Sequence, residues 1–122
     1  MKRTIATLVA IASLVLPTAA LADTSAATPG QNNARRQATS YLQYQAFSRS
    51  GLIKQLKFEG FTTAQATYGV TALHANWSRE AALSAKQYLQ YQGFSRSGLI
   101  QQLQFEGYTL GQATYGVNRA GL

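Results

Sequence analysis

The sequence contains no cysteine among its 122 residues. Disulfides, which stabilise many small exported domains, are therefore excluded, and the fold depends on a packed apolar core. The same absence removes the residue to which bacterial lipoproteins attach their lipid. Histidine occurs once, at His74, and no group of His, Asp and Glu has the spacing of metal ligands. We therefore expect neither a metal nor another cofactor.

Long apolar runs are equally scarce, and the only one lies at the N-terminus, in MKRTIATLVAIASLVLPTAALA. A basic start precedes the run, Pro17 interrupts it, and the small residues Ala20 and Ala22 close it. This is the pattern of a secretory signal peptide over residues 1–22, and the run is shorter than the roughly 20 apolar residues of a membrane-spanning helix. We expect an exported chain with a flexible linker over residues 23–33 and no transmembrane segment after cleavage.

Acidic residues number only four, against eleven Lys and Arg, which gives a net charge of +7. Signal cleavage would remove Lys2 and Arg3, leaving nine basic and four acidic side chains and a net charge of +5. A balance of this sign suits an anionic partner such as a cell-wall polymer, an acidic protein face or nucleic acid.

A duplicated segment fills most of the remaining chain. Residues 38–70 align with residues 85–117 without a gap, and YLQYQAFSRSGLIKQLKFEG returns 47 positions later as YLQYQGFSRSGLIQQLQFEG. We expect two tandem repeats, over residues 34–75 and 76–122. Two copies are too few for a solenoid, so a pair of docked helical units is favoured.

Each copy predicts three short helices, which makes the expected fold all-α. In the second copy Ser95 and Thr109 are placed to cap the second and third helices, and Gln112 completes a capping box with Thr109. The first copy has the same pattern, except that Pro and Gly precede it. Its first helix is therefore expected to begin near Asn32 or Asn33.

The ends and the apolar faces of these helices can also be read from the sequence. Leu99, Ile100 and Leu103 recur at helical spacing and predict the buried stripe of the second helix. Glycines follow the first and second helices at Gly93 and Gly107, and both are expected to end them.

Catalytic chemistry is not indicated, and we expect no enzyme. His74 lies at the joint between the repeats without a carboxylate placed to orient it. Ser95 and Ser97 have no base nearby in the sequence, as a nucleophile would need. Glu59 and Glu106 occur once per copy and are expected at the surface, beside their glycine turns.

Two binding functions compete at this stage. Short helices around a glycine turn also outline a DNA-reading helix-turn-helix. However, the expected reading helix, TLGQATYGV, contains no Lys or Arg for phosphate contacts, and export separates the chain from chromosomal DNA, so nucleic acid is disfavoured. Seven tyrosines are enough to stack sugars, which would suit a cell-wall or glycan-binding module. Aromatic side chains more often fill a core, and we expect most of the tyrosines there.

The string YL…FSRSGLI.QL.FEG[FY]T..QATYGV, preceded in the second copy by NW…A…A, resembles the Ltp family. These are host-cell-surface-exposed lipoproteins of Gram-positive bacteria and their temperate phages. The resemblance covers Ala34 to about Gly121 and implies tandem helix-turn-helix-like units. It also implies superinfection exclusion, in which family members of prophage origin block injection of phage DNA by engaging the phage tape-measure protein.

One position departs from that family pattern. Asp23 stands where the lipid-bearing cysteine would follow the signal peptide. The resemblance therefore implies a secreted, cell-surface or wall-associated protein without the lipid, and the basic balance would retain it on anionic wall polymers.

The positions at which the copies differ suggest where a partner binds. Lys54 and Lys57 of the first copy are replaced by Gln101 and Gln104 in the second. With Arg49 near the start of the same helix, they would give one copy a basic outer face and the other a neutral one. We therefore take Arg49, Lys54, Lys57, Gln101 and Gln104 as the candidate partner-binding surface.

Overall fold

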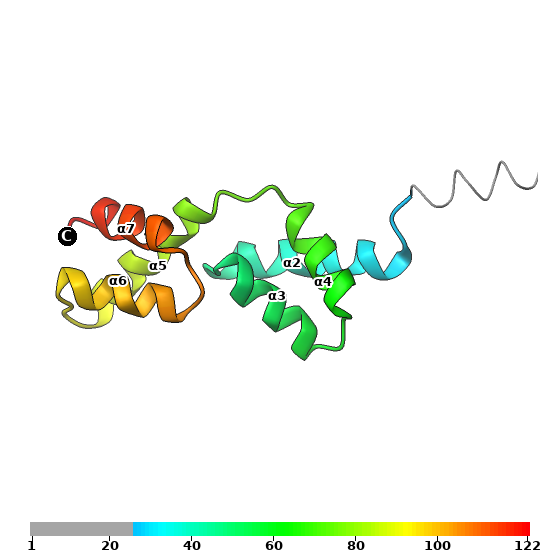
Figure 1. Cartoon of the computed structure of the whole chain (residues 1–122), viewed down its shortest axis with the longest axis horizontal. Coiled ribbons are helices and arrows are strands. Elements are labelled where there is room, and N and C mark those ends of the chain that lie inside the picture. The colour runs from blue at the N-terminus through cyan, green and yellow to red at the C-terminus, as the bar shows by residue number, and fades with distance from the viewer. Residues whose placement is uncertain (1–25) are drawn as a thin grey trace, which may run out of the picture.

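The computed structural model describes residues 26–122, and the regular elements in that range are all helices. The two three-helix units follow one another along the long axis, with the C-terminus at one end (Figure 1). The predicted all-α fold of two tandem three-helix repeats is confirmed. The expected signal peptide lies outside the described residues. The helices are α2 (Pro29–Tyr44), α3 (Arg49–Phe58), α4 (Thr63–Thr71), α5 (Trp77–Tyr91), α6 (Arg96–Phe105) and α7 (Leu110–Arg119).

The helix starts follow from side chains that satisfy the free backbone N–H groups of a first turn. Ser48 and Ser95 each accept a hydrogen bond of 2.9 Å from the amide three residues on. Thr62 and Thr109 form complete capping boxes, as predicted for both third helices. None of the helices in residues 26–122 has the length and hydrophobicity to cross a bilayer.

The start of α2 corrects one prediction. We expected the helix near Asn32 or Asn33, but it begins at Pro29, so the last part of the expected linker is helical. Thr28 caps it and shares a capping box with Gln31. Pro29 fits the first helical position because its missing N–H would have had no partner there.

The ends of α3 and α6 depend on glycine, as predicted. Gly60 and Gly107 have φ angles of 105° and 106°, a left-handed conformation that other residues rarely adopt. After α3, the Gly60 N–H donates to the Lys57 carbonyl at 3.0 Å, and the Phe61 N–H donates to the Leu56 carbonyl at 3.2 Å. This pair of bonds is a Schellman motif, which satisfies the last carbonyls of the helix.

Gly93 stands just past the end of the first helix of the second copy, as predicted, but it does not end the helix through a left-handed conformation. The helix α5 ends at Tyr91, and Gln92 follows in an extended conformation with φ −161°. Gly93 has no positive φ, and the first copy has Ala46 at the equivalent position. Glycine is therefore not required for this turn.

Within each repeat, the first and third helices cross at a glycine. A Cβ atom built on Gly69 would lie 2.7 Å from the Ala34 carbonyl carbon, and one built on Gly116 would lie 2.6 Å from that of Ala81. Real Cβ atoms do not approach backbone so closely, so these helices pack backbone to backbone. The close crossing leaves each repeat with a small core, made in the first of Ala34, Ala38, Leu52, Leu56, Ala66 and Val70, and in the second of Ala81, Ala85, Leu99, Leu103, Tyr108, Ala113 and Val117.

The tyrosines contradict our prediction that most of them lie in the core. Only Tyr108 is buried, and Tyr41 and Tyr88 are half-buried, each in an edge-on contact with a neighbouring phenylalanine. The remaining four are exposed: Tyr44, Tyr68, Tyr91 and Tyr115. The alanines and glycines that bring the helices together leave no room for these large rings inside.

The repeats dock through two unlike edges. The donor edge of the first repeat is the turn that leads into α3. There, the hydroxyls of Ser48 and Ser50 donate to the carbonyls of Glu106 and Gly107 at 2.6 and 3.2 Å. These carbonyls belong to the turn between α6 and α7, which is the acceptor edge of the second repeat.

Two further contacts complete the junction. The Phe47 N–H lies 3.4 Å from a carboxylate oxygen of Glu80, on the first turn of α5. The Trp77 ring, at the start of α5, packs against the core of the first repeat together with Leu73 of the connecting segment. The contact is heterologous, because the surface each repeat contributes differs from that of its partner.

Candidate binding surfaces

The outer side of α3 presents two cations around one exposed ring. Leu52 and Leu56 face the core, and Phe58 lies about 200° around the helix from Leu56, at roughly 100° per residue. Lys54 is one turn before Phe58, and Lys57 is adjacent to it. All three side chains are exposed, and we name this group the α3 face.

The α6 face is the same surface without the charge. Gln101, Gln104 and Phe105 occupy the equivalent positions, and all are exposed. The two phenylalanines have 87% and 86% of their surface exposed, which is unusual because nothing in the fold compensates for solvating an aromatic ring. A protruding ring at the same place in both repeats makes these faces candidates for contact with a partner.

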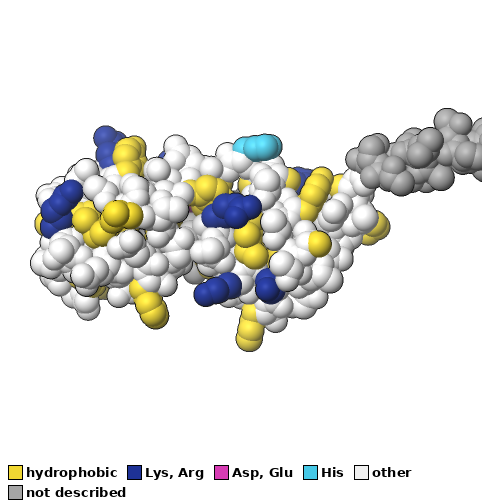
Figure 2. All heavy atoms as spheres, viewed as in Figure 1, with side chains coloured by type: hydrophobic (Ala, Val, Ile, Leu, Met, Phe, Trp, Pro, Cys, Tyr) yellow, Lys and Arg dark blue, Asp and Glu magenta, His cyan; other side chains and the backbone are white. Residues whose placement is uncertain are grey.

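The two helices that carry these faces lie on the same side of the molecule. In Figure 1, α3 and α6 run along its lower edge. In the same view, Lys and Arg side chains lie over α3, hydrophobic side chains project from the lower edge, and acidic side chains are nearly absent (Figure 2). A partner that contacts both helices would meet one exposed aromatic ring on each, and the ring on α3 is flanked by two lysines.

Arg49 is placed apart from the other predicted residues. It begins α3, about 140° around the helix from Lys54. Its guanidinium donates to the Thr71 hydroxyl at 2.9 Å, which ties the start of α3 to the end of α4. The structure therefore groups Lys54 and Lys57 with a ring that we had not selected. The sequence already indicated this exposed position, because Phe58 does not lie on the apolar stripe of Leu52 and Leu56.

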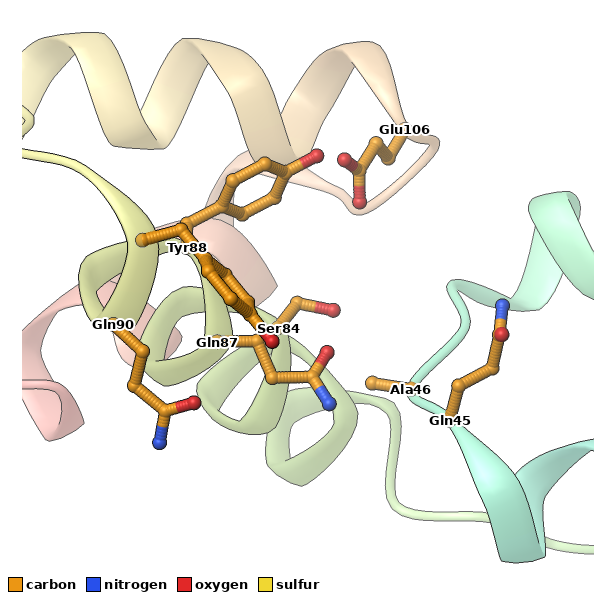
Figure 3. Close-up of a pocket in the computed structure, with 8 residues that line it drawn as sticks. Gln45, Ala46, Ser84, Gln87, Tyr88, Gln90 and Glu106 are labelled. Carbon is orange, nitrogen blue, oxygen red and sulfur yellow. The ribbon is translucent and has the colours of Figure 1, made fainter.

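A cleft of about 440 Å³ opens beside the junction. Gln45 and Ala46 of the first repeat face Ser84, Gln87 and other residues of the second across it (Figure 3). Its lining includes three glutamine and two tyrosine side chains, and no general base or metal-ligand group is assembled there. We take the cleft as a consequence of docking rather than a ligand site.

Two glutamates of the second repeat are partly desolvated at this junction. Burial raises the pKa of the Glu80 carboxyl, opposed by the hydrogen bond from the Phe47 N–H and by the nearby Arg79 cation. Burial also raises the pKa of Glu106, whose carboxylate accepts a hydrogen bond from Gln102 at 3.3 Å. Docking thus places two acids where their ionised forms are disfavoured.

Substituting Glu106→Gln should change how stability depends on pH. A raised pKa means that the folded protein holds the proton more tightly, so the free energy of unfolding falls as pH rises from about 4.5 through the folded pKa. Glutamine keeps the acceptor without the charge. We expect the variant to melt above the wild type at pH 7 and level with it at pH 4, in thermal unfolding followed by circular dichroism.

The control for this prediction is Glu59→Gln, the matching change in the first repeat. Glu59 is exposed and lies outside the junction. An equal difference in melting temperature at both pH values for Glu106→Gln would contradict the desolvation argument.

The described residues contain no group of three or more His, Cys, Asp or Glu able to hold a metal ion. His74 lies in the connecting segment with a φ of 48°, and Ser95 caps α6 through its hydroxyl. No base faces Ser97 or Ser95 in the hydrogen bonds of this part of the chain. The third helices carry a single basic residue between them, Arg119 in the last turn of α7, which is a poor basis for groove binding.

Fold and surface together define a small all-helical protein of two docked three-helix repeats. The sequence matches the Ltp family, described as host cell surface-exposed lipoproteins, over residues 30–73 and again over residues 76–119. These matches cover most of the chain, and it belongs to this family. The first match begins next to Pro29, where α2 starts. No curated protein and no solved structure matches the chain.

Proposed function

We propose that this protein acts outside the cell membrane by binding a phage tail component, and that it thereby excludes superinfecting phage. The partner we propose is the tape-measure protein, and the effect is a block of DNA entry after adsorption. Membership of a family of host cell surface-exposed proteins supports the location. The observation that carries the binding role is the pair of exposed phenylalanines, Phe58 and Phe105, at equivalent positions of α3 and α6.

The chemistry of the two faces suits an extended protein partner. Aromatic anchors commonly supply most of the energy of a protein interface, and the polar residues around them set its specificity. The α3 face, with Lys54 and Lys57, would bind an acidic stretch, and the α6 face, with Gln101 and Gln104, a neutral one. Two anchors on one chain also raise the effective concentration of the second contact once the first has formed.

The same charges support retention on an anionic wall polymer as a second, compatible role. Retention of this kind would not depend on a lipid, for which the sequence has no cysteine. The exposed Lys54 and Lys57 would contribute to such binding, which salt would weaken.

The proposal is tested by expressing the protein in a phage-sensitive host and challenging the cells. We expect adsorption to be unchanged while potassium efflux and DNA entry are strongly reduced, because the block acts after receptor binding. Reduced adsorption would favour a wall-binding protein that masks receptors, and full infection would contradict exclusion. A variant with Phe58→Ser and Phe105→Ser supplies the matched inactive control.

A further inference from the structure

The donor edge occurs twice but is used once. Phe47, Ser48 and Ser50 of the first repeat are identical to Phe94, Ser95 and Ser97 of the second. In the first repeat these groups donate to the second, and Ser48 is only 2% exposed. In the second repeat, Ser95 and Ser97 are exposed at the start of α6, at the end of the molecule beyond the junction (Figure 1).

The acceptor edge is also present twice. The Glu106 and Gly107 carbonyls receive the serine hydroxyls, and Glu59 and Gly60 repeat them with the same backbone turn, at φ angles of 106° and 105°. Glu59 and Gly60 are exposed. At the position of Glu80 the first repeat has Asn33, whose side-chain oxygen is also able to accept from a backbone N–H.

Residues of the first repeat are more exposed than their counterparts in the second, as expected if the acceptor edge of the first repeat is uncovered. Tyr108 is buried, but Phe61 is half-exposed, and Ser84 is buried where its counterpart Gln37 is exposed. The first repeat has a hollow over this surface, in the region where the second repeat receives the turn before α3. It is lined by Asn33, Arg36, Gln37, Ser40 and Phe61.

We propose that a second copy of this chain occupies the hollow, so that molecules associate head to tail. The turn before α6 of one molecule, with Ser95 and Ser97, would bind the free acceptor edge of the next, with Glu59 and Gly60. The contact would repeat the hydrogen bonds seen inside the molecule. Because a heterologous contact leaves one unlike edge free at each end, it can propagate into an open chain of molecules.

The intermolecular contact should be weaker than the internal one. Trp77 has no counterpart, since Gly30 stands at the equivalent position. Gln37 is larger than Ser84, and its amide would have to leave Glu59, to which it donates at 3.2 Å. The internal contact is also helped by the covalent connection between repeats. We therefore expect reversible association that grows with concentration, not a permanent oligomer.

The test uses two variants that each block one edge. Ser97→Glu places a bulky anion against the backbone carbonyls that the serine would meet, and Asn33→Arg removes the acceptor for the Phe94 N–H. Both positions are exposed in the folded molecule. Sedimentation velocity of the wild type, from micromolar to millimolar concentration, should show a rising average mass. Each variant alone should lose that rise.

Mixing the variants then distinguishes this interface from others. Ser97→Glu keeps the acceptor edge and Asn33→Arg keeps the donor edge, so an equimolar mixture should form a complex of two chains and no larger species. Thr63→Glu adds the same charge to the first turn of α4. Its counterpart Leu110 stays 59% exposed beside the occupied acceptor edge, so this variant should associate like the wild type. A wild type that stays monomeric, or variants that still self-associate, would overturn the proposal. Neither outcome bears on phage exclusion, because the α3 and α6 faces are not part of this contact.

Discussion

Replacing Gly116 by Ala is expected to unfold the second repeat, the largest effect on stability that we predict for a single methyl group. The new Cβ would lie 2.6 Å from the Ala81 carbonyl carbon and 2.8 Å from its oxygen. Both belong to the backbone of α5, which cannot rotate away as a side chain would. The helices would have to separate, at a cost at or above the upper end of the about 1–3 kcal/mol typical of overpacked cores. Chemical unfolding followed by circular dichroism measures this loss.

Two glycine substitutions serve as controls. Gly111→Ala is in the same helix but meets open space, and the first repeat already has Ala64 there. It should stabilise the protein by up to about 1 kcal/mol, because alanine loses less backbone freedom on folding. Gly69→Ala should disrupt the first repeat instead, and the fluorescence of Trp77, which packs on that core, should report it. Equal stability of Gly116→Ala and Gly111→Ala would show that the crossing is not as close as described.

Phage exclusion should be lost when both exposed rings are removed, through Phe58→Ser and Phe105→Ser. An aromatic anchor at the centre of an interface typically contributes at least about 2 kcal/mol, which is about thirtyfold in Kd for one ring. The fold should be intact, because both rings are almost fully solvated. Plaque counts on expressing cells, with circular dichroism of the purified variant, would measure the two effects separately. Exclusion at the wild-type level would show that the rings are not the anchors.

The contribution of the two lysines on the α3 face to binding can be measured separately from that of Phe58. Lys54→Gln with Lys57→Gln converts this face into a copy of the α6 face, which carries Gln101 and Gln104. Binding to an acidic partner should weaken and lose its salt dependence, while helicity stays unchanged. If binding is unchanged, the lysines are ordinary solvated residues, and the phenylalanines act without them.

Much of the fold was predictable because it is local. Ser95 and Thr109 cap their helices, Gly107 ends one, and the Leu99–Leu103 stripe faces the core, each through contacts within a few residues along the chain. Neighbouring residues in the sequence carry such information. The same reasoning failed for α2, where Pro29 was read as a boundary before the helix although it is well suited to begin one.

The relative placement of the repeats could not be predicted, for a different reason. The donor edge uses residues that are identical in both copies, so comparison of the copies does not show that Ser48 is covered and Ser95 is not. For the candidate surface, Lys54, Lys57, Gln101 and Gln104 were found by comparing the copies. Phe58 and Phe105 were missed by that comparison because they do not differ. Identical exposed residues, which repeat comparison overlooks, are the ones that both copies would use in common.

The docking geometry also means that the order of the two repeats is encoded in the chain. The second repeat carries the residues that suit the acceptor role. Trp77 covers the neighbouring core, and the Glu80 carboxylate accepts a hydrogen bond from the Phe47 N–H. The Tyr108 hydroxyl donates to the Glu80 carbonyl at 3.2 Å, which fixes the acceptor turn on α5. If the order of the copies were exchanged, glycine, asparagine and phenylalanine would stand in place of Trp77, Glu80 and Tyr108. The copies have therefore become specialised halves of one molecule, and a duplication that began as two equal units now has a direction.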